Sequence, residues 1–264
     1  MNLSWSQIFR LGLVQMALGA IVVLTTSTLN RLMVVEFSLP ALLPGALVGL
    51  HYGIQLSRPR WGFRSDVGGN RTRWIIGGMI TLALGGVGAT YAVTLFALHY
   101  WLALSASILS YGMIGIGVGA SGTSLLALLA TATAANRRAA AATITWLMMI
   151  FGIALTAGVA GQFLDPYSPE RLMAVVSTIA ILAIVLTVLA IWNIERSVSP
   201  RSSEPEIPFQ KALREVWAES KTRNFTIFVF LSMNAYFMQE LILEPYAGLV
   251  FGFTPGQSTS LSGA

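Results

Sequence analysis

One polar stretch separates two long apolar runs of this chain: Gly62-Phe63-Arg64-Ser65-Asp66-Val67-Gly68-Gly69-Asn70-Arg71. The stretch is too polar for the hydrocarbon core of a bilayer and too short to form a domain. We therefore expect a loop that joins two membrane helices at one water interface. Arginine is concentrated here, and short arginine-rich loops stay in the cytoplasm. The arginines in or beside the loop are Arg58, Arg60, Arg64, Arg71 and Arg73.

The composition of the whole chain also indicates a membrane protein. Charged residues make up 10% of the chain and hydrophobic residues 55%, whereas an ordinary soluble domain is roughly 25% charged. The net charge of +5 has a topological explanation, so we expect no nucleic-acid partner. Cysteine is absent, which excludes disulfides, thiolate catalysis and cysteine-ligated metals.

Seven apolar runs are long enough to be membrane helices. The first run is too long for a signal peptide and is expected to remain as an anchor. The basic residues lie at one side of these runs, except Arg31 and Arg171, so the N-terminus is predicted to be cytoplasmic. The expected spans are Leu11 to Val35, Pro40 to Leu56, Trp74 to Leu98, Trp101 to Ala130, Ala139 to Phe163, Arg171 to Ile194 and Phe225 to Leu243.

The order of these runs predicts three regions. Residues 1–194 form a six-helix transmembrane bundle, and residues 195–223 form a cytoplasmic linker. The linker contains an amphipathic helix with Phe209, Leu213, Val216 and Trp217 on one face, which we expect to lie on the membrane surface. Residues 224–264 form a seventh span, which ends at Pro245, and an external tail. This layout is that of the first half of a twelve-helix carrier followed by an incomplete second half.

The polar loop resembles the signature of the major facilitator superfamily between helices two and three. The residues that match are Gly62, Ser65, Asp66, Gly69 and Arg71, whereas Arg64, Val67 and Asn70 depart from the pattern. The resemblance implies an all-α, polytopic transmembrane helical bundle, namely the N-terminal half of that fold plus helix seven. It also implies a conformational role for the loop, in which Asp66 engages charges and a helix end across the two halves.

Longer strings resemble the PucC/LhaA family within that superfamily. They are Leu13 to Ala20, Leu29 to Glu36, Pro40 to Gly45, Trp61 to Gly69 and Gln239 to Gly252. The resemblance implies delivery of bacteriochlorophyll and assembly of light-harvesting complexes in the inner membrane, cytoplasmic or intracytoplasmic, of a photosynthetic bacterium. It implies membrane lipids, light-harvesting polypeptides or other photosynthetic assembly proteins as partners. Bacteriochlorophyll would be a cargo, with no permanently bound cofactor.

Polar residues inside the first span are candidates for contact with pigment or partner. Gln15, Thr26 and Asn30 share one face of a helix that turns 100° per residue. Arg31 lies near the outer end, where a buried charge is costly, so we expect it to reach the interface with Glu36 as its partner. Two interpretations stay open for Arg31: a structural ion pair, or a contact to a pigment carbonyl or a light-harvesting helix.

His51 is the histidine that lies well inside a span, and Gln55 follows it by one helical turn. An imidazole can ligate the magnesium of a bacteriochlorin, and Gln55 would support it; the alternative is a hydrogen-bonded structural histidine. Glu240 and Glu244 form an external acidic pair that binds a cation or a partner's basic residue, or only marks the interface. No further metal site is expected.

Glycines on the fourth span predict a helix-packing seam, because small residues let membrane helices approach closely; the alternative is a smooth surface that a flat macrocycle slides past. They are Gly112, Gly115, Gly117, Gly119 and Gly122.

The function predicted from the sequence is not enzymatic, since no nucleophile or acid–base group accompanies His51. The first six spans carry no acidic residue at mid-depth, which disfavours a proton-coupled carrier. We predict a membrane assembly factor or carrier that delivers or holds bacteriochlorophyll, or that shepherds light-harvesting polypeptides. The alternatives are a secondary transporter of a small amphipathic solute and a structural subunit of a photosynthetic complex.

Overall fold

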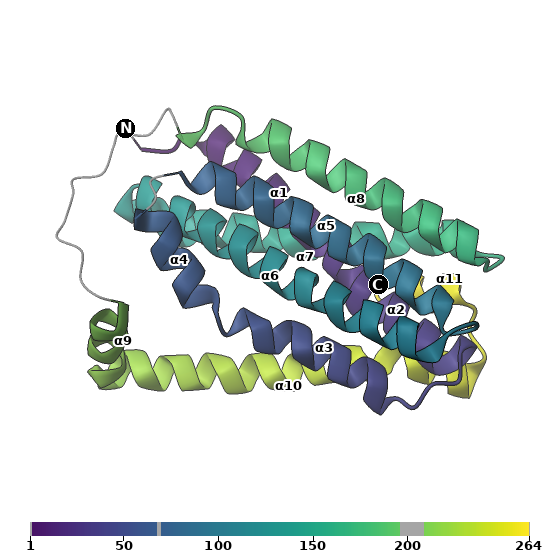
Figure 1. The fold of residues 1–264 in the computed structure, drawn as a ribbon. Coiled ribbons are helices and arrows are strands. Elements are labelled where there is room, and N and C mark those ends of the chain that lie inside the picture. Colours follow the sequence, from purple (N-terminus) through teal and green to yellow (C-terminus); the bar gives the residue numbers. More distant parts are fainter. Residues whose placement is uncertain (1, 68–69, 196–208, 264) are drawn as a thin grey trace.

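The computed structural model describes residues 2–67, 70–195 and 209–263, and within these ranges every regular element is a helix (Figure 1). The all-α bundle predicted from the sequence is thereby confirmed. The elements are α1 (Trp5–Val23), η1 (Leu24–Thr28), α2 (Leu29–Arg31), η2 (Leu32–Glu36), α3 (Leu42–Gln55), α4 (Arg58–Val67), α5 (Arg71–Leu95), α6 (Tyr100–Ala132), η3 (Ala135–Arg137), α7 (Arg138–Leu164), α8 (Pro169–Ile191), α9 (Phe209–Ala218), α10 (Ser220–Phe251) and α11 (Pro255–Leu261).

Five of the described helices are long and apolar enough to cross a membrane: Trp5–Glu36, Arg71–Leu95, Tyr100–Ala132, Ala135–Leu164 and Pro169–Ile191. They correspond to the first, third, fourth, fifth and sixth predicted spans. The second predicted span contains only the 14-residue α3, and the seventh lies within the 32-residue α10. The division of the chain into three regions stays a prediction.

The first helix is one continuous rod from Trp5 to Glu36 that includes two π-helical segments, η1 and η2. It begins with a capping box, in which Ser4 N–H donates to Gln7 Oε1 at 2.8 Å and Gln7 N–H donates to Ser4 Oγ at 3.3 Å. Such a box satisfies two backbone donors that the first turn leaves free. The carbonyl of Thr25 in η1 accepts a hydrogen bond from the hydroxyl of the buried Tyr111 of α6, at 2.8 Å.

The helices pack around the first rod and around the α5–α6 pair (Figure 1). Helix α1 contacts α7 and α8, helix α5 contacts α6 and α8, and α3 lies against α6. Aliphatic side chains fill the space between them, among them Leu11, Met79, Leu82 and Ile114, each fully buried. Helix α10 meets the rest of the bundle mainly through η1, α2, η2 and α11.

Arginines gather at one end of the bundle, which we call the basic end. Arg10 donates to the carbonyls of Ala190 and Trp192 at the end of α8, at 2.9 and 2.6 Å. The carboxylate of Glu195 accepts the backbone N–H groups of Arg71 and Thr72 at 2.8 and 2.9 Å. A carboxylate at this position stabilises the positive N-terminus of α5. These contacts fix the starts and ends of α1, α5 and α8 to one another.

The polar stretch from Gly62 to Arg71 is not a loop throughout, which corrects the sequence prediction. Residues up to Val67 belong to α4, and Arg71 begins α5. The break in the second span comes earlier, between Gln55 and Arg58, because Pro59 has no N–H to continue the helical ladder of α3. At the break, Ser57 Oγ donates to the carbonyl of Ile54 at 2.6 Å and accepts from Trp61 Nε1 at 2.8 Å.

Helix α10 also differs from its prediction, because it continues through Pro245 to Phe251 instead of ending at the proline. It ends at Gly252, whose φ of 66° is the left-handed conformation that glycine adopts most easily. A second capping box, between Thr254 and Gln257, then starts α11. The amphipathic helix predicted in the linker is present as α9, with Leu213, Val216 and Trp217 exposed.

Candidate functional site

Arg31 is buried at the end of the bundle that carries α11, which we call the α11 end. Its Nη1 donates to Glu36 Oε1 at 2.8 Å, and its Nη2 donates to the carbonyl of Phe253 at 2.6 Å. The expected partner Glu36 is therefore present. The side chain of Arg31 does not extend to the surface as expected, because it is only 2% exposed. The segment after α10 folds back over the guanidinium and supplies a carbonyl in place of water.

The side chain of Asn30 replaces a backbone hydrogen-bond donor that Pro245 lacks. In an α-helix the N–H of residue 245 would donate to the carbonyl of Leu241, but proline has no N–H. Asn30 Nδ2 donates to that carbonyl instead, at 2.7 Å. The first rod therefore supplies α10 with the hydrogen bond that its own proline removes, which joins the two helices at a specific depth.

Replacing Asn30 with alanine should lower the stability of the protein by about 1–3 kcal/mol, because the partly buried Leu241 carbonyl loses its donor. Thermal unfolding of the purified protein in detergent would measure the effect. The control is Pro245→Ala, which restores an N–H within α10. In that background the loss caused by Asn30→Ala should shrink markedly. Equal losses in both backgrounds would show that the amide does not compensate for the proline.

Glu244 is fully buried rather than exposed at an interface, whereas its pairing with Glu240 stays a prediction. Its carboxylate accepts from Ser262 Oγ at 2.7 Å and from Thr259 Oγ1 at 3.4 Å. Thr259 in turn lies 3.0 Å from the hydroxyl of Thr28 on the first rod. Helix α11 thus shields the carboxylate with hydroxyl groups. The side chain of Glu240 lies outside the described residues.

Close backbone contacts and hydrogen bonds to the carboxylate of Asp165 hold helix α11 against α7. Asp165 Oδ2 accepts from Thr254 Oγ1 at 2.6 Å, and Oδ1 accepts from the N–H of Gly256 at 3.1 Å. A Cβ on Gly256 would lie within 2.4 Å of Asp165 and would also collide with the Gly161 carbonyl. Together with Arg31, Asn30 and Glu244, these contacts close the α11 end of the described bundle.

The other two candidates of the first rod do not join this cluster. Gln15 is buried and its Nε2 lies 3.5 Å from Met149 Sδ on α7, while Gln15 Oε1 has no partner among the described residues. Thr26 donates to the carbonyl of Val22 at 2.9 Å, within its own helix. The common face of Gln15, Thr26 and Asn30 assumed a regular α-helix. The π-helical segment η1 lies between Gln15 and Asn30 and has more residues per turn than an α-helix. Asn30 therefore faces α10 and not the side on which Gln15 lies.

His51 and Gln55 form a hydrogen-bonded trio with Arg58 at the junction of α3 and α4. Gln55 Nε2 lies 2.8 Å from His51 Nε2, and Arg58 Nη2 donates to Gln55 Oε1. Since Arg58 engages the amide oxygen, the amide nitrogen is the group that donates to His51 Nε2. The hydrogen of the neutral imidazole is then assigned to Nδ1 from this network. His51 is 1% exposed, and Nδ1 has no partner among the described residues.

Glycine explains why His51 lies so close to α6. A Cβ on Gly115 would lie 2.7 Å from the carbonyl oxygen of His51 and 3.0 Å from Ile54 Cβ. The glycine therefore lets the backbones of α3 and α6 approach closely. The trio therefore lies near a helix break and between two helices. It consists of one buried imidazole and two adjacent side chains that form hydrogen bonds.

The residues of the loop motif are only partly described. Gly62 lies in α4, where a Cβ would be 3.1 Å from Thr123 Cγ2. Arg71 is buried and donates to Thr131 Oγ1 and the Ala127 carbonyl on α6. The side chains of Ser65 and Asp66, and Gly69 as a whole, lie outside the described residues, so the conformational role of the motif stays a prediction.

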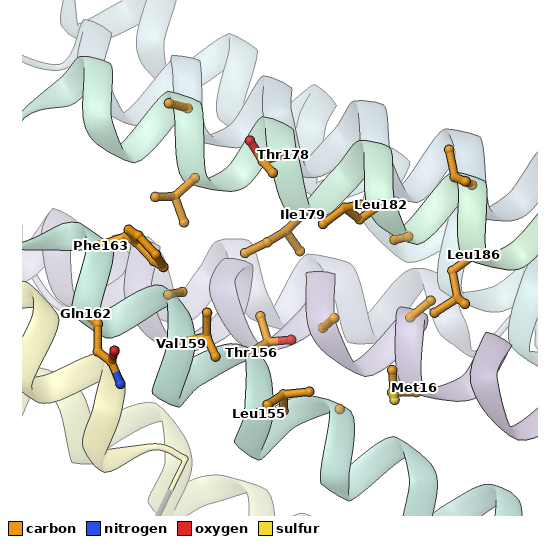
Figure 2. Close-up of a pocket in the computed structure, with 18 of the residues that line it drawn as sticks. Met16, Leu155, Thr156, Val159, Gln162, Phe163, Thr178, Ile179, Leu182 and Leu186 are labelled. Atoms are coloured by element: carbon orange, nitrogen blue, oxygen red, sulfur yellow. The ribbon is translucent and has the colours of Figure 1, made fainter.

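A groove between α7 and α8 was not predicted from the sequence. It encloses about 1060 Å³ and is floored by α1, with Met16, Leu155, Thr156, Phe163 and Leu182 among its lining residues (Figure 2). The groove exists because α7 and α8 each pack on α1 but scarcely on each other. Helices α7 and α8 follow each other in the sequence, but α1, which forms the floor, lies far from both, so no local pattern signals the groove.

Within the described residues, no three His, Cys, Asp or Glu side chains gather as a possible metal site. The groove offers contact area to a small molecule, and the imidazole trio offers directed polar groups.

Comparison with known proteins shows to which family the chain is similar. A family model described as PUCC protein matches residues 28–264. A Rhodobacter capsulatus protein named bacteriochlorophyll synthase 44.5 kDa chain is 65% identical over 266 residues, which cover 100% of this chain and 62% of that protein. A protein PucC of Cereibacter sphaeroides is 30% identical over 275 residues, which cover 97% of this chain and 59% of the relative. The chain thus spans about three fifths of the length of these relatives.

Proposed function

This chain belongs to the PucC family, and from that membership we propose that it handles bacteriochlorophyll, without catalysing a reaction, while light-harvesting complexes assemble. The observation that carries the proposal is the relative of Rhodobacter capsulatus, which matches all of this chain at 65% identity and has bacteriochlorophyll in its name. The apolar helices, five of which can cross a membrane, give such a pigment a protein surface at the depth where it dissolves.

The proposed pigment contact is the trio of His51, Gln55 and Arg58. Bacteriochlorophyll carries a magnesium ion that takes an axial nitrogen or oxygen ligand, and a neutral imidazole supplies one. In the structure the lone pair of His51 Nε2 accepts from Gln55. Ligation therefore requires Gln55 to release His51, which frees the amide and the guanidinium to donate to pigment carbonyls. An exchangeable ligand suits a protein that holds its cargo only in transit.

Replacing His51 with phenylalanine should reduce the pigment that co-purifies with the protein by about tenfold, which corresponds to the loss of about 1.4 kcal/mol of binding free energy. The chain would be produced in a bacteriochlorophyll-synthesising bacterium, purified in detergent and examined by absorption spectroscopy. The matched control is His99→Phe, because His99 is exposed in the turn between α5 and α6. That variant should keep the pigment content of the unmodified chain.

Two results would contradict the proposal. Equal pigment in the His51→Phe and His99→Phe variants would remove His51 as the ligand. Absence of pigment from the unmodified chain, together with capture of light-harvesting polypeptides in a strain that makes no pigment, would favour a role in handling polypeptides instead.

A second candidate function follows from the printed name of the same relative, which calls it a chain of a bacteriochlorophyll synthase. A catalytic subunit would change the absorption spectrum of an added pigment precursor over time, whereas a carrier leaves the spectrum of its cargo constant after binding. We favour the carrier because the sequence has no cysteine and the described residues hold no cluster of potential metal ligands.

We further propose that the chain lies in the bacterial inner membrane with its N-terminus in the cytoplasm, and that light-harvesting polypeptides are its partners. The support for the orientation is the basic end, where Arg10, Arg71 and Arg138 bond to helix ends. Arginines at a membrane interface favour the cytoplasmic side. The first half of a major facilitator fold plus its seventh helix remains the architecture that we propose for this chain.

A further inference from the structure

The groove between α7 and α8 is bounded by three helices. Met16, Ala17 and Ala20 of α1 lie at its floor, and the small residues Gly152 and Ala160 of α7 leave it wide. On α8 the lining residues extend from Arg171 to Leu189, which is about 27 Å at 1.5 Å per residue. This length is close to the roughly 30 Å of a bilayer's hydrocarbon core. A chain-shaped ligand lying along α8 would therefore stay in the groove over its whole length.

The rim of the groove is aliphatic and faces outward. Leu155, Val159, Leu182, Val185 and Leu189 line it, and each is between 44% and 63% exposed. Figure 2 shows Leu182 and Leu186 of α8 across from Val159 and Leu155 of α7. In a bilayer such a surface meets hydrocarbon chains, which it can bind by van der Waals contact.

The charged groups of the groove, Asp165 and Arg171, lie at one end. Arg171 lies there with an exposed side chain, and its Nη1 donates to the carbonyl of Asp165 at 2.6 Å. The carboxylate of Asp165 is engaged by Thr254 and Gly256 of the α11 segment. Glu170 precedes Arg171 in the first turn of α8 but is not among the lining residues. A guanidinium offers five N–H donors in a geometry that matches a phosphate.

From this arrangement we propose that the groove binds an anionic phospholipid, with its phosphate at Arg171 and an acyl chain along α8 between α7 and α8. The ligand is a lipid rather than the pigment, because no imidazole lies among the lining residues to ligate magnesium. The lipid supplies contacts that α7 and α8 do not make with each other. This inference does not depend on the proposed function.

Phosphatidylglycerol should stabilise the protein through this site. A ligand that binds only the folded state raises the unfolding temperature by mass action. Added to the purified chain in detergent, it should raise the midpoint by about 5 °C, whereas phosphatidylcholine should raise it far less. The increase specific to phosphatidylglycerol should disappear in Arg171→Gln. It should persist in Arg73→Gln, which removes an exposed arginine at the basic end.

A second variant tests the acyl-chain part of the groove. Ala174→Phe places a ring among the lining residues one turn after Arg171, so it should lower the response to phosphatidylglycerol while the protein remains folded. Native mass spectrometry should then show one retained phospholipid on the unmodified chain and none on this variant.

Three outcomes would overturn the proposal. They are an equal response to both lipids, a full response in Arg171→Gln, and loss of co-purified pigment rather than lipid in Ala174→Phe. The last would assign the groove to the pigment. The pigment assay on His51 is a separate measurement, so either proposal can fail alone.

Discussion

Leucine in place of Gly117 is expected to leave very little folded protein in the membrane. A Cβ at this position would lie 2.7 Å from the carbonyl oxygen of Gly78 and would also collide with the backbone N of Leu82. Both obstacles are backbone atoms of α5, so no side-chain rotation relieves them. Helices α5 and α6 would have to separate, which would expose the buried contacts of Leu82 and Ile114.

The size of the effect follows from overpacking. Extra carbon atoms in a well-packed core typically cost about 1–3 kcal/mol and occasionally more, and backbone obstacles place Gly117→Leu at or above the upper end. Size-exclusion chromatography of detergent-solubilised membranes would measure the amount of folded protein, and thermal unfolding would measure the stability of what remains.

Gly49→Leu is the matched control for this prediction. A Cβ on Gly49 of α3 meets nothing within 4 Å, so the side chain would extend into open space. Leucine also stabilises a helix by about 0.8 kcal/mol relative to glycine. The control should therefore purify at least as well as the unmodified chain. Similar losses in both variants would mean that leucine is poorly tolerated for a reason other than the α5–α6 contact.

The glycines of the fourth span show how far the sequence could go. Their presence predicted close helix packing, and the structure bears this out. Their spacing predicted one seam, but Gly115 faces the backbone of His51 on α3 while Gly117 faces Gly78 on α5. Residues two apart point to opposite sides of a helix. Which neighbour each side meets depends on the arrangement of three helices, which the sequence of one helix does not contain.

Helix positions were predictable because a run of about twenty apolar residues has few alternatives in a bilayer. Helix α4 was missed because its arginines and Gly62 read as a loop, although Pro59 favours the first turn of a helix. The π-helical segments of the first rod have no signature in hydrophobic periodicity, so the face that contains Asn30 was misplaced. The burial of Glu244 depends on Thr259 and Ser262, which fold back from beyond the end of α10.

Glu36→Leu should destabilise the protein by about 3 kcal/mol, the lower end of the range for removing one partner of a buried ion pair. Arg31 and Glu36 form an ion pair, with Arg31 2% exposed and Glu36 34% exposed. Without Glu36 the buried guanidinium keeps the carbonyl of Phe253 but loses the carboxylate that it contacts directly. Thermal unfolding in detergent would measure the loss.

The unequal burial of the two partners predicts an unequal response to their removal. Arg31→Met keeps most of the side-chain volume and leaves Glu36 as the unpaired charge, but Glu36 is partly exposed and water can solvate it. Arg31→Met should therefore cost less than Glu36→Leu, although arginine makes the larger number of contacts. The double variant Arg31→Met with Glu36→Leu should be more stable than Glu36→Leu alone, because no guanidinium is then left buried without the carboxylate that it contacts. If the double variant is instead the least stable of the three, the pair contributes more by attraction than it costs by desolvation, and the cluster at the α11 end depends on that attraction.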